Sequence, residues 1–177
     1  MLNIFVNTWG NYNTNGADGG EWITLPMEEA ELEEVLATIA HNMGDNDPEW
    51  AIHDYEWETE IDLGEVHELS SIHHWNELCN NLYRLTEGEA EEIAAAMDAY
   101  GYTVEEAFER QARGCFIFYA GMDLEEVAEE MVDDMIASYA KGEVPEIFAR
   151  YFDYSAFARD LSFEGYNQTK YGVILDC

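Results

Sequence analysis

The chain has 177 residues, of which 39 are Asp or Glu and only 7 are Lys or Arg, so its formal net charge is −32. Its hydrophobic share of 47% and aromatic share of 14% exclude a segment disordered by charge, which would have few residues of either kind. The charge disfavours direct contact with nucleic acid or anionic membranes, and it favours a basic protein surface as partner.

The charge is unevenly spread along the chain. Residues 1–83 hold 18 acids and no base, and residues 84–177 hold 21 acids and all 7 bases. Over residues 144–177 the two signs nearly balance and aromatic residues are dense. A nearly neutral aromatic region on a self-repelling chain predicts self-association there.

Three features bear on the compartment. No run approaches the ~20 apolar residues of a membrane span. The first six residues lack a basic region and so favour a strand over a signal peptide. Cys79, Cys115 and Cys177 are widely spaced, which fits a reduced, cytoplasmic protein better than a disulfide framework.

Residues 1–62 are predicted to form a small α+β domain. Strands are expected over 2–9, 21–25 and 50–56, with a turn-rich loop over 10–20. A helix is expected over 28–43, because Leu32, Leu36 and Ile39 recur at helical spacing and Gly44 follows.

Residues 63–111 are predicted to form a helical middle domain. One helix should follow a cap at Ser70 or Ser71, a second should cover 87–100, and Thr103 with Glu106 matches a capping box that would open a third.

Residues 112–177 are predicted to form a C-terminal α+β domain. A buried strand is expected over 115–120 and a helix from a cap at Asp123 to about residue 140. Gly142 and Pro145 should separate this helix from an aromatic, helix-rich segment, and a last strand is expected over 173–175.

Motifs for catalysis or cofactor binding are missing from the sequence. No phosphate-binding Gly-rich loop and no dinucleotide fingerprint is present. His67, His73 and His74 match no zinc motif and are expected to be ordinary surface or capping histidines. The three cysteines are too scattered for a closed zinc site, although the sequence alone does not exclude their convergence in space. We therefore expect no enzymatic activity, no cofactor and no metal.

The most informative pattern is a helix over 123–134. Its predicted apolar face comprises Leu124, Val127, Met131, Met135 and Ile136. Acid pairs recur every four residues on another face, namely Glu125, Glu126, Glu129, Glu130, Asp133 and Asp134. No base is interleaved, although like charges at i,i+4 destabilise a helix by roughly 0.2–0.5 kcal/mol per pair.

The spacing of these acids matches a phosphate backbone. Four helical residues rise ~6 Å, so two acids per four residues give about one charge per 3 Å, against ~3.4 Å for one DNA strand. This similarity favours a DNA mimic. A merely soluble acidic protein is the alternative, but it does not explain the nearly neutral aromatic end.

Several short blocks resemble the ArdA family of antirestriction proteins. They lie at both ends of the chain in the family's order: residues 10–13, 20–26, 52–56, 142–145, 151–154 and 158–161. Residues 63–112 resemble the family only in being acidic and helical. The resemblance implies an elongated α+β chain of three small domains, a homodimer formed through the C-terminal part, and an origin in phages or mobile elements.

The resemblance also implies a function without catalysis or cofactor. The protein would evade host defence by occupying the DNA-binding groove of type I restriction–modification enzymes in the bacterial cytoplasm. The expected partner-binding acids are Glu28, Glu29, Glu33, Glu34, Glu89, Glu91, Glu92 and the six acids of 125–134. The expected dimer contacts are Tyr151, Phe152, Tyr154 and Phe157.

Two alternatives stay open. One is a DNA mimic directed at another target, such as a CRISPR effector or a nucleoid protein. The other is an acidic cation-binding protein, since Asp45, Asn46 and Asp47 resemble the start of a calcium loop, although Pro48 follows and the sixth position lacks glycine.

Overall fold

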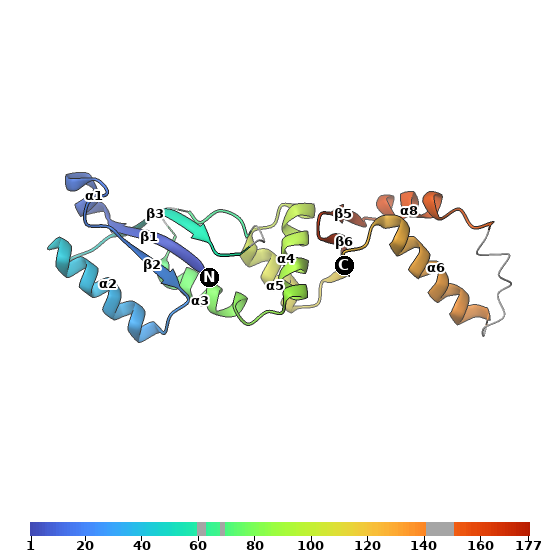
Figure 1. Cartoon of the computed structure of the whole chain (residues 1–177), viewed down its shortest axis with the longest axis horizontal. Helices are drawn as coiled ribbons and strands as arrows, with labels where there is room; N and C mark the ends of the chain where they lie inside the picture. The colour runs from blue at the N-terminus through green and yellow to red at the C-terminus, as the bar shows by residue number, and fades with distance from the viewer. Residues whose placement is uncertain (60–62, 68–69, 141–150) are drawn as a thin grey trace. The chain divides into compact units, whose positions relative to one another are not determined.

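The computed structural model describes residues 1–59, 63–67, 70–140 and 151–177, and contacts divide the chain into two units, Met1–Thr86 and Glu87–Cys177 (Figure 1). The predicted break at Gly142 and Pro145 and the predicted domain end at residue 62 lie outside the described residues. The first unit has 18 acids and one base and the second has 21 acids and six bases, so both are strongly acidic.

A three-stranded antiparallel sheet forms the first unit with helices beside it (Figure 1). Its strands are β1 (Leu2–Thr8), β2 (Glu21–Leu25) and β3 (Trp50–Trp57), in the order β2-β1-β3. Leu2, Ile4 and Val6 alternate along β1 and are each 0% exposed, as expected where one sheet face is covered. The predicted strands are confirmed.

Helix α2 (Glu29–Met43) separates an acidic outer face from an apolar inner face. Leu32, Leu36 and Ile39 are buried, and the helix ends at Gly44, whose left-handed φ of 71° suits glycine. This helix and its terminating glycine agree with the sequence prediction.

Residues 9–15 form helix α1 (Trp9–Asn15), so the predicted loop over 10–20 was wrong in its first half. The Thr8 side chain caps this helix by accepting a hydrogen bond from the backbone N of Asn11 (3.2 Å). The buried Asn7 accepts from Asn11 Nδ2 (2.9 Å). Asparagine favours turns in isolated segments, but here Asn7 and Asn11 satisfy each other's hydrogen-bonding groups inside the unit.

Asn76 fixes helix α3 (Ile72–Leu82) against the segment that precedes α2. This side chain is 2% exposed. Its Nδ2 donates to the carbonyl O of Met27 (2.9 Å), and its Oδ1 accepts from the Met27 backbone N (2.8 Å). Ser71 caps α3 as predicted. The start of α2 and the first turns of α3 are thereby held side by side.

The second unit contains a sheet in the order β4-β6-β5, built from β4 (Phe116–Ala120), β5 (Asn167–Thr169) and β6 (Gly172–Asp176). Helix α4 (Glu87–Tyr100) packs against all three strands, and α5 (Val104–Ala112) follows it with the predicted Thr103 capping box. Contacts therefore group α3 with the first sheet, and α4 and α5 with the second. The finer three-domain division stays a prediction.

One prediction about this sheet was wrong, and one of its strands was missed. Strand β4 was expected to be buried, but it lies at an edge and Ile117 is 41% exposed. The short strand β5 was not predicted, because its three residues Asn167, Gln168 and Thr169 show no apolar alternation.

Helices α6 (Leu124–Ala140) and α8 (Tyr154–Phe163) pack on each other beside this sheet (Figure 1). Their shared core comprises Val127, Ala128, Ala158, Leu161, Tyr166 and Val173. The buried face of α6 also includes Val132, whereas Met135 is 44% exposed and was wrongly assigned to it.

An ionic hydrogen-bond network ties the end of β6 to α5. Arg110 Nη2 donates to Asp176 Oδ1 (2.5 Å) and Oδ2 (2.6 Å), and Tyr102 Oη donates to Oδ2 (2.5 Å). Burial raises the pKa of Asp176, but the hydrogen bonds from Arg110 and Tyr102 outweigh it and hold the pKa below its ordinary value.

The predicted α+β class is confirmed. The described residues form seven helices and two small antiparallel sheets, one towards each end of the chain. No helix within that part of the chain has the length and apolar character needed to cross a membrane.

Replacing Asn76 by alanine should destabilise the first unit. Both backbone groups of Met27 would lose their partner, and an unsatisfied buried polar group costs about 1–3 kcal/mol. Urea denaturation measures this loss. Asn42→Ala, at an exposed position on α2, is the matched control and should change the free energy of unfolding by less than about 0.5 kcal/mol. Equal losses in the two variants would contradict the proposed role of Asn76.

Asp176→Asn should destabilise the second unit in a pH-dependent way. The folded pKa of Asp176 lies below the unfolded one, so its stabilisation is present above the unfolded pKa and is lost as pH falls through the folded pKa. The difference in thermal midpoint between the wild type and the variant should therefore shrink as pH falls from about 7 to about 3. For the control Asp98→Asn, on the exposed side of α4, no such convergence is expected.

Candidate functional site

The N-terminus of α6 is capped by its own acids. Asp123 Oδ1 accepts hydrogen bonds from the backbone N of Glu125 and of Glu126, each 2.9 Å long. Glu126 Oε2 in turn accepts from the Asp123 backbone N (2.9 Å). Acids in this first turn also interact favourably with the positive end of the helix dipole. Helix α6 therefore begins where the sequence predicted.

From this first turn onwards, α6 presents an acidic face to solvent. All six acids of the predicted pattern, at 125, 126, 129, 130, 133 and 134, are exposed, while Val127, Ala128 and Val132 are buried. Ser155 donates a hydrogen bond to Glu125 (2.7 Å). Within the described ranges no Lys or Arg pairs with any of the six. The face is thus a row of exposed carboxylates without basic partners among those residues.

Helix α2 offers a second acidic face. Glu28 precedes its first turn, and Glu29, Glu33 and Glu34 follow on the helix, all of them exposed. Since Leu32, Leu36 and Ile39 hold the opposite face inside the unit, these carboxylates point away from the core.

The acids predicted on α4 are less accessible. Glu89, Glu91 and Glu92 are all partly buried. Burial raises the pKa of Glu92, opposed by a hydrogen bond from the Gln111 side chain, while the charge of Glu89 raises it further. These three carboxylates are therefore poorer phosphate equivalents than those of α2 and α6.

The predicted dimer residues separate into two groups. Tyr151 is 80% exposed. Phe152 lies 5.0 Å from Tyr154 and 5.8 Å from Phe157 between ring centroids, and Phe157 packs against the α6–α8 core. Phe163, which the sequence reading did not single out, is also 80% exposed. Among the aromatic residues of 151–177, Tyr151 and Phe163 are therefore the ones exposed to a partner.

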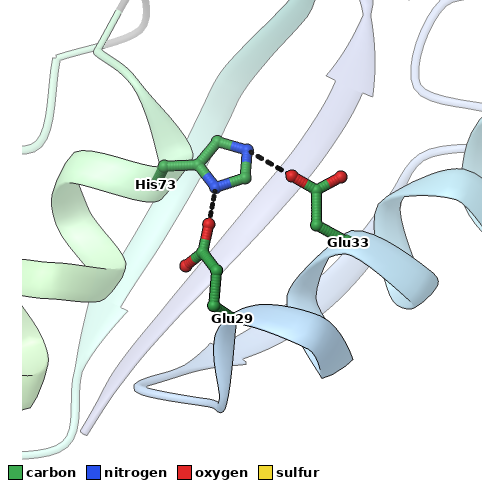
Figure 2. A group of neighbouring side chains, drawn as sticks. All are labelled: Glu29, Glu33 and His73. Atoms are coloured by element: carbon green, nitrogen blue, oxygen red, sulfur yellow. Dashed lines mark hydrogen bonds and ion pairs between the residues drawn. The ribbon is translucent and has the colours of Figure 1, made fainter.

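The structure brings His73 of α3 between two acids of α2 (Figure 2). Nδ1 of His73 lies 2.8 Å from Glu29 Oε1, and Nε2 lies 3.7 Å from Glu33 Oε1. The one-turn spacing of the two acids is visible in the sequence, but their contact with a residue 44 positions beyond Glu29 is not. The sequence analysis missed this cluster because the spacing of Glu29, Glu33 and His73 matches no metal-binding motif.

A hollow of about 550 Å³ opens beside this cluster. Carboxylates, imidazoles and amides line it: Glu28, Glu29, His73, His74, Asn76, Glu77 and Asn80. No Lys or Arg is among the lining residues, so the hollow should attract cations rather than anions.

Comparison with known proteins identifies the whole chain with one family. The family model described as "Antirestriction protein (ArdA)" matches residues 4–175, which covers both units. A search of curated proteins gives no match. The chain therefore belongs to the ArdA family of antirestriction proteins, which inhibit type I restriction enzymes and are not themselves enzymes.

Proposed function

We propose that this antirestriction protein acts as a DNA mimic, whose acidic helix faces enter the DNA-binding groove of type I restriction–modification enzymes. The observation that carries the proposal is the face of α6, on which six exposed acids follow one another with their apolar neighbours turned into the core. Incoming DNA would then escape restriction because the groove is already occupied.

Spacing supports this role. Along α6 the acid pairs recur at about 6 Å, which gives about one charge per 3 Å of helix axis. One strand of B-DNA carries a phosphate per ~3.4 Å, so Lys and Arg side chains placed to hold phosphates can also hold these carboxylates. Phosphate contacts position a protein on DNA without reading sequence, so a mimic of the backbone needs no base-like groups.

Energetics supports it as well. Like charges at i,i+4 destabilise a helix by roughly 0.2–0.5 kcal/mol per pair, and α6 carries four such pairs among its six acids. A groove lined with Lys and Arg would relieve this repulsion on binding. Free α6 is therefore destabilised relative to its complex with a basic partner, which favours association.

We also infer that the protein forms a homodimer through the aromatic residues at its C-terminal end. Tyr151 and Phe163 are highly exposed in a unit that otherwise presents mainly acids. Aromatic side chains are enriched in protein interfaces, and charged residues are depleted from interface cores. Phe152, Tyr154 and Phe157 would support this contact from behind, since they pack against one another within the chain.

Neutralising the acidic face of α6 should weaken inhibition. Exposed ion pairs contribute about 0.2–1 kcal/mol each, so Glu129→Gln alone should lower affinity less than about fivefold, and replacing all six acids by amides should lower it at least about tenfold. Competition with DNA for a purified type I restriction enzyme measures this. A second variant controls for total charge, since it replaces six exposed acids of the first unit by amides: Glu21, Asp47, Glu49, Asp54, Glu56 and Glu58.

The outcomes of this experiment distinguish the position of the acids on α6 from the total charge of the protein. Affinity for the enzyme should also fall steeply as salt rises, with a smaller slope for the six-amide variant. Equal losses in the two sets of variants would contradict a specific role for α6. Failure to compete with DNA at any salt concentration would contradict groove binding, and binding to another DNA-binding protein instead would favour the alternative target.

Tyr151→Ser should shift the monomer–dimer equilibrium towards monomer, because a large aromatic contact would be removed from the interface. Sedimentation velocity over a concentration series measures the shift. Tyr83→Ser is the matched control, since Tyr83 is 73% exposed but belongs to the first unit. A wild-type chain that stays monomeric at all concentrations would contradict the dimer.

A further inference from the structure

We propose that His73 and Glu33 bind a divalent transition-metal ion such as Zn²⁺, with Glu29 orienting the imidazole. Glu29, Glu33 and His73 offer donor atoms that all lie within 4.8 Å of one another (Figure 2). The inference concerns α2 and α3 of the first unit alone and does not rest on the identity of the inhibited enzyme.

The hydrogen bond at Nδ1 determines which ring nitrogen is free. Glu29 is a carboxylate and can only accept, so the 2.8 Å contact requires His73 Nδ1 to carry the proton. In a neutral ring Nε2 then keeps its lone pair. Metal-binding histidines are commonly held in this way, by a carboxylate that accepts from the nitrogen not bound to the ion.

The space between His73 Nε2 and Glu33 is where a cation would fit. Nε2 of His73 faces Glu33 Oε1 at 3.7 Å, which is longer than an N–H···O hydrogen bond of about 2.7–3.2 Å. When the ring is neutral, two electron-pair donors therefore face each other, and when it is protonated the same contact is an ion pair that a metal ion would replace. Ligand bonds of about 2.0–2.2 Å at a tetrahedral angle would place the two donor atoms about 3.4 Å apart, so an ion fits between them after a small shift.

The surroundings suit such an ion. The side chains of His73 and Glu33 are both exposed, so water can complete the coordination shell of an ion held between them. Glu28, Glu29 and Glu77 line the hollow beside the cluster, and no Lys or Arg occurs in the sequence before Arg84. One imidazole and one carboxylate select zinc and its transition-metal neighbours over magnesium and calcium, which prefer oxygen ligands alone.

Asn76 gives the cluster its geometry. His73 and Asn76 lie one turn apart on α3. Asn76 forms two hydrogen bonds with the backbone of Met27, two residues before Glu29. The two helices that supply the donors are thus held together by a buried clamp rather than by the exposed donors themselves. A bound ion would cancel negative charge on the acidic face of α2 and so reduce the charge available to a partner.

Calorimetry with Zn²⁺ on the full chain tests the site, in physiological salt and excess Mg²⁺ to occupy non-specific carboxylates. One zinc per chain should bind above the background. His73→Ala and Glu33→Gln should each raise the Kd for zinc by at least about tenfold. Glu29→Gln should raise it by about tenfold, because the hydrogen bond that orients the imidazole is lost. The controls Glu34→Gln and His41→Ala, both exposed on α2, should leave Kd within about twofold.

Nitrogen NMR of the imidazole provides a readout independent of charge. Zinc should shift the Nε2 resonance of His73 and leave the other histidines unchanged. A His73→Ala variant that binds zinc as tightly as the wild type would overturn the proposal. A loss of zinc affinity in Glu34→Gln as large as that in Glu33→Gln would also overturn it, because binding would then depend on total charge rather than on the position of the carboxylate. Circular dichroism of each variant verifies that the fold is kept.

Discussion

Mutual repulsion among carboxylates is the constraint on which the rest of this structure depends. A net charge of −32 on 177 residues weakens any compact state, so each element must keep its acids on the solvent side and its apolar residues inside. Helices α2 and α6 do this most clearly, with Leu32 and Leu36 or Val127 and Val132 buried opposite rows of Glu and Asp. The surface that we propose for inhibition is thus also the surface that folding requires.

The sequence predicted those features that depend on neighbouring residues. Gly44, Ser71, Thr103 and Asp123 end or begin helices as expected, because capping involves residues within one turn. The α+β class followed from the same local patterns. The phasing of the acids on α6 was also visible in sequence, since it needs only the helical period.

Features that depend on distant residues were missed or wrong. Ile117 is exposed while its neighbour Phe116 on the edge strand β4 is buried, and no local pattern reveals which face of that strand is covered. Helix α1 carries the buried Asn7–Asn11 contact, and His73 meets Glu29 where Asn76 joins α3 to the segment before α2. The aromatic residues near the C-terminal end show the same limit, since composition does not distinguish the exposed Tyr151 from Phe157, which packs on the core.

The acidic face of α6, without a basic partner in the described ranges, has a consequence for the behaviour of the protein in solution. Added salt screens carboxylate from carboxylate and so should favour the folded chain. The same salt screens carboxylate from the Lys and Arg of a target and so should favour the free protein. Ionic strength therefore moves folding and target binding in opposite directions, and the protein should be most effective where it is least stable.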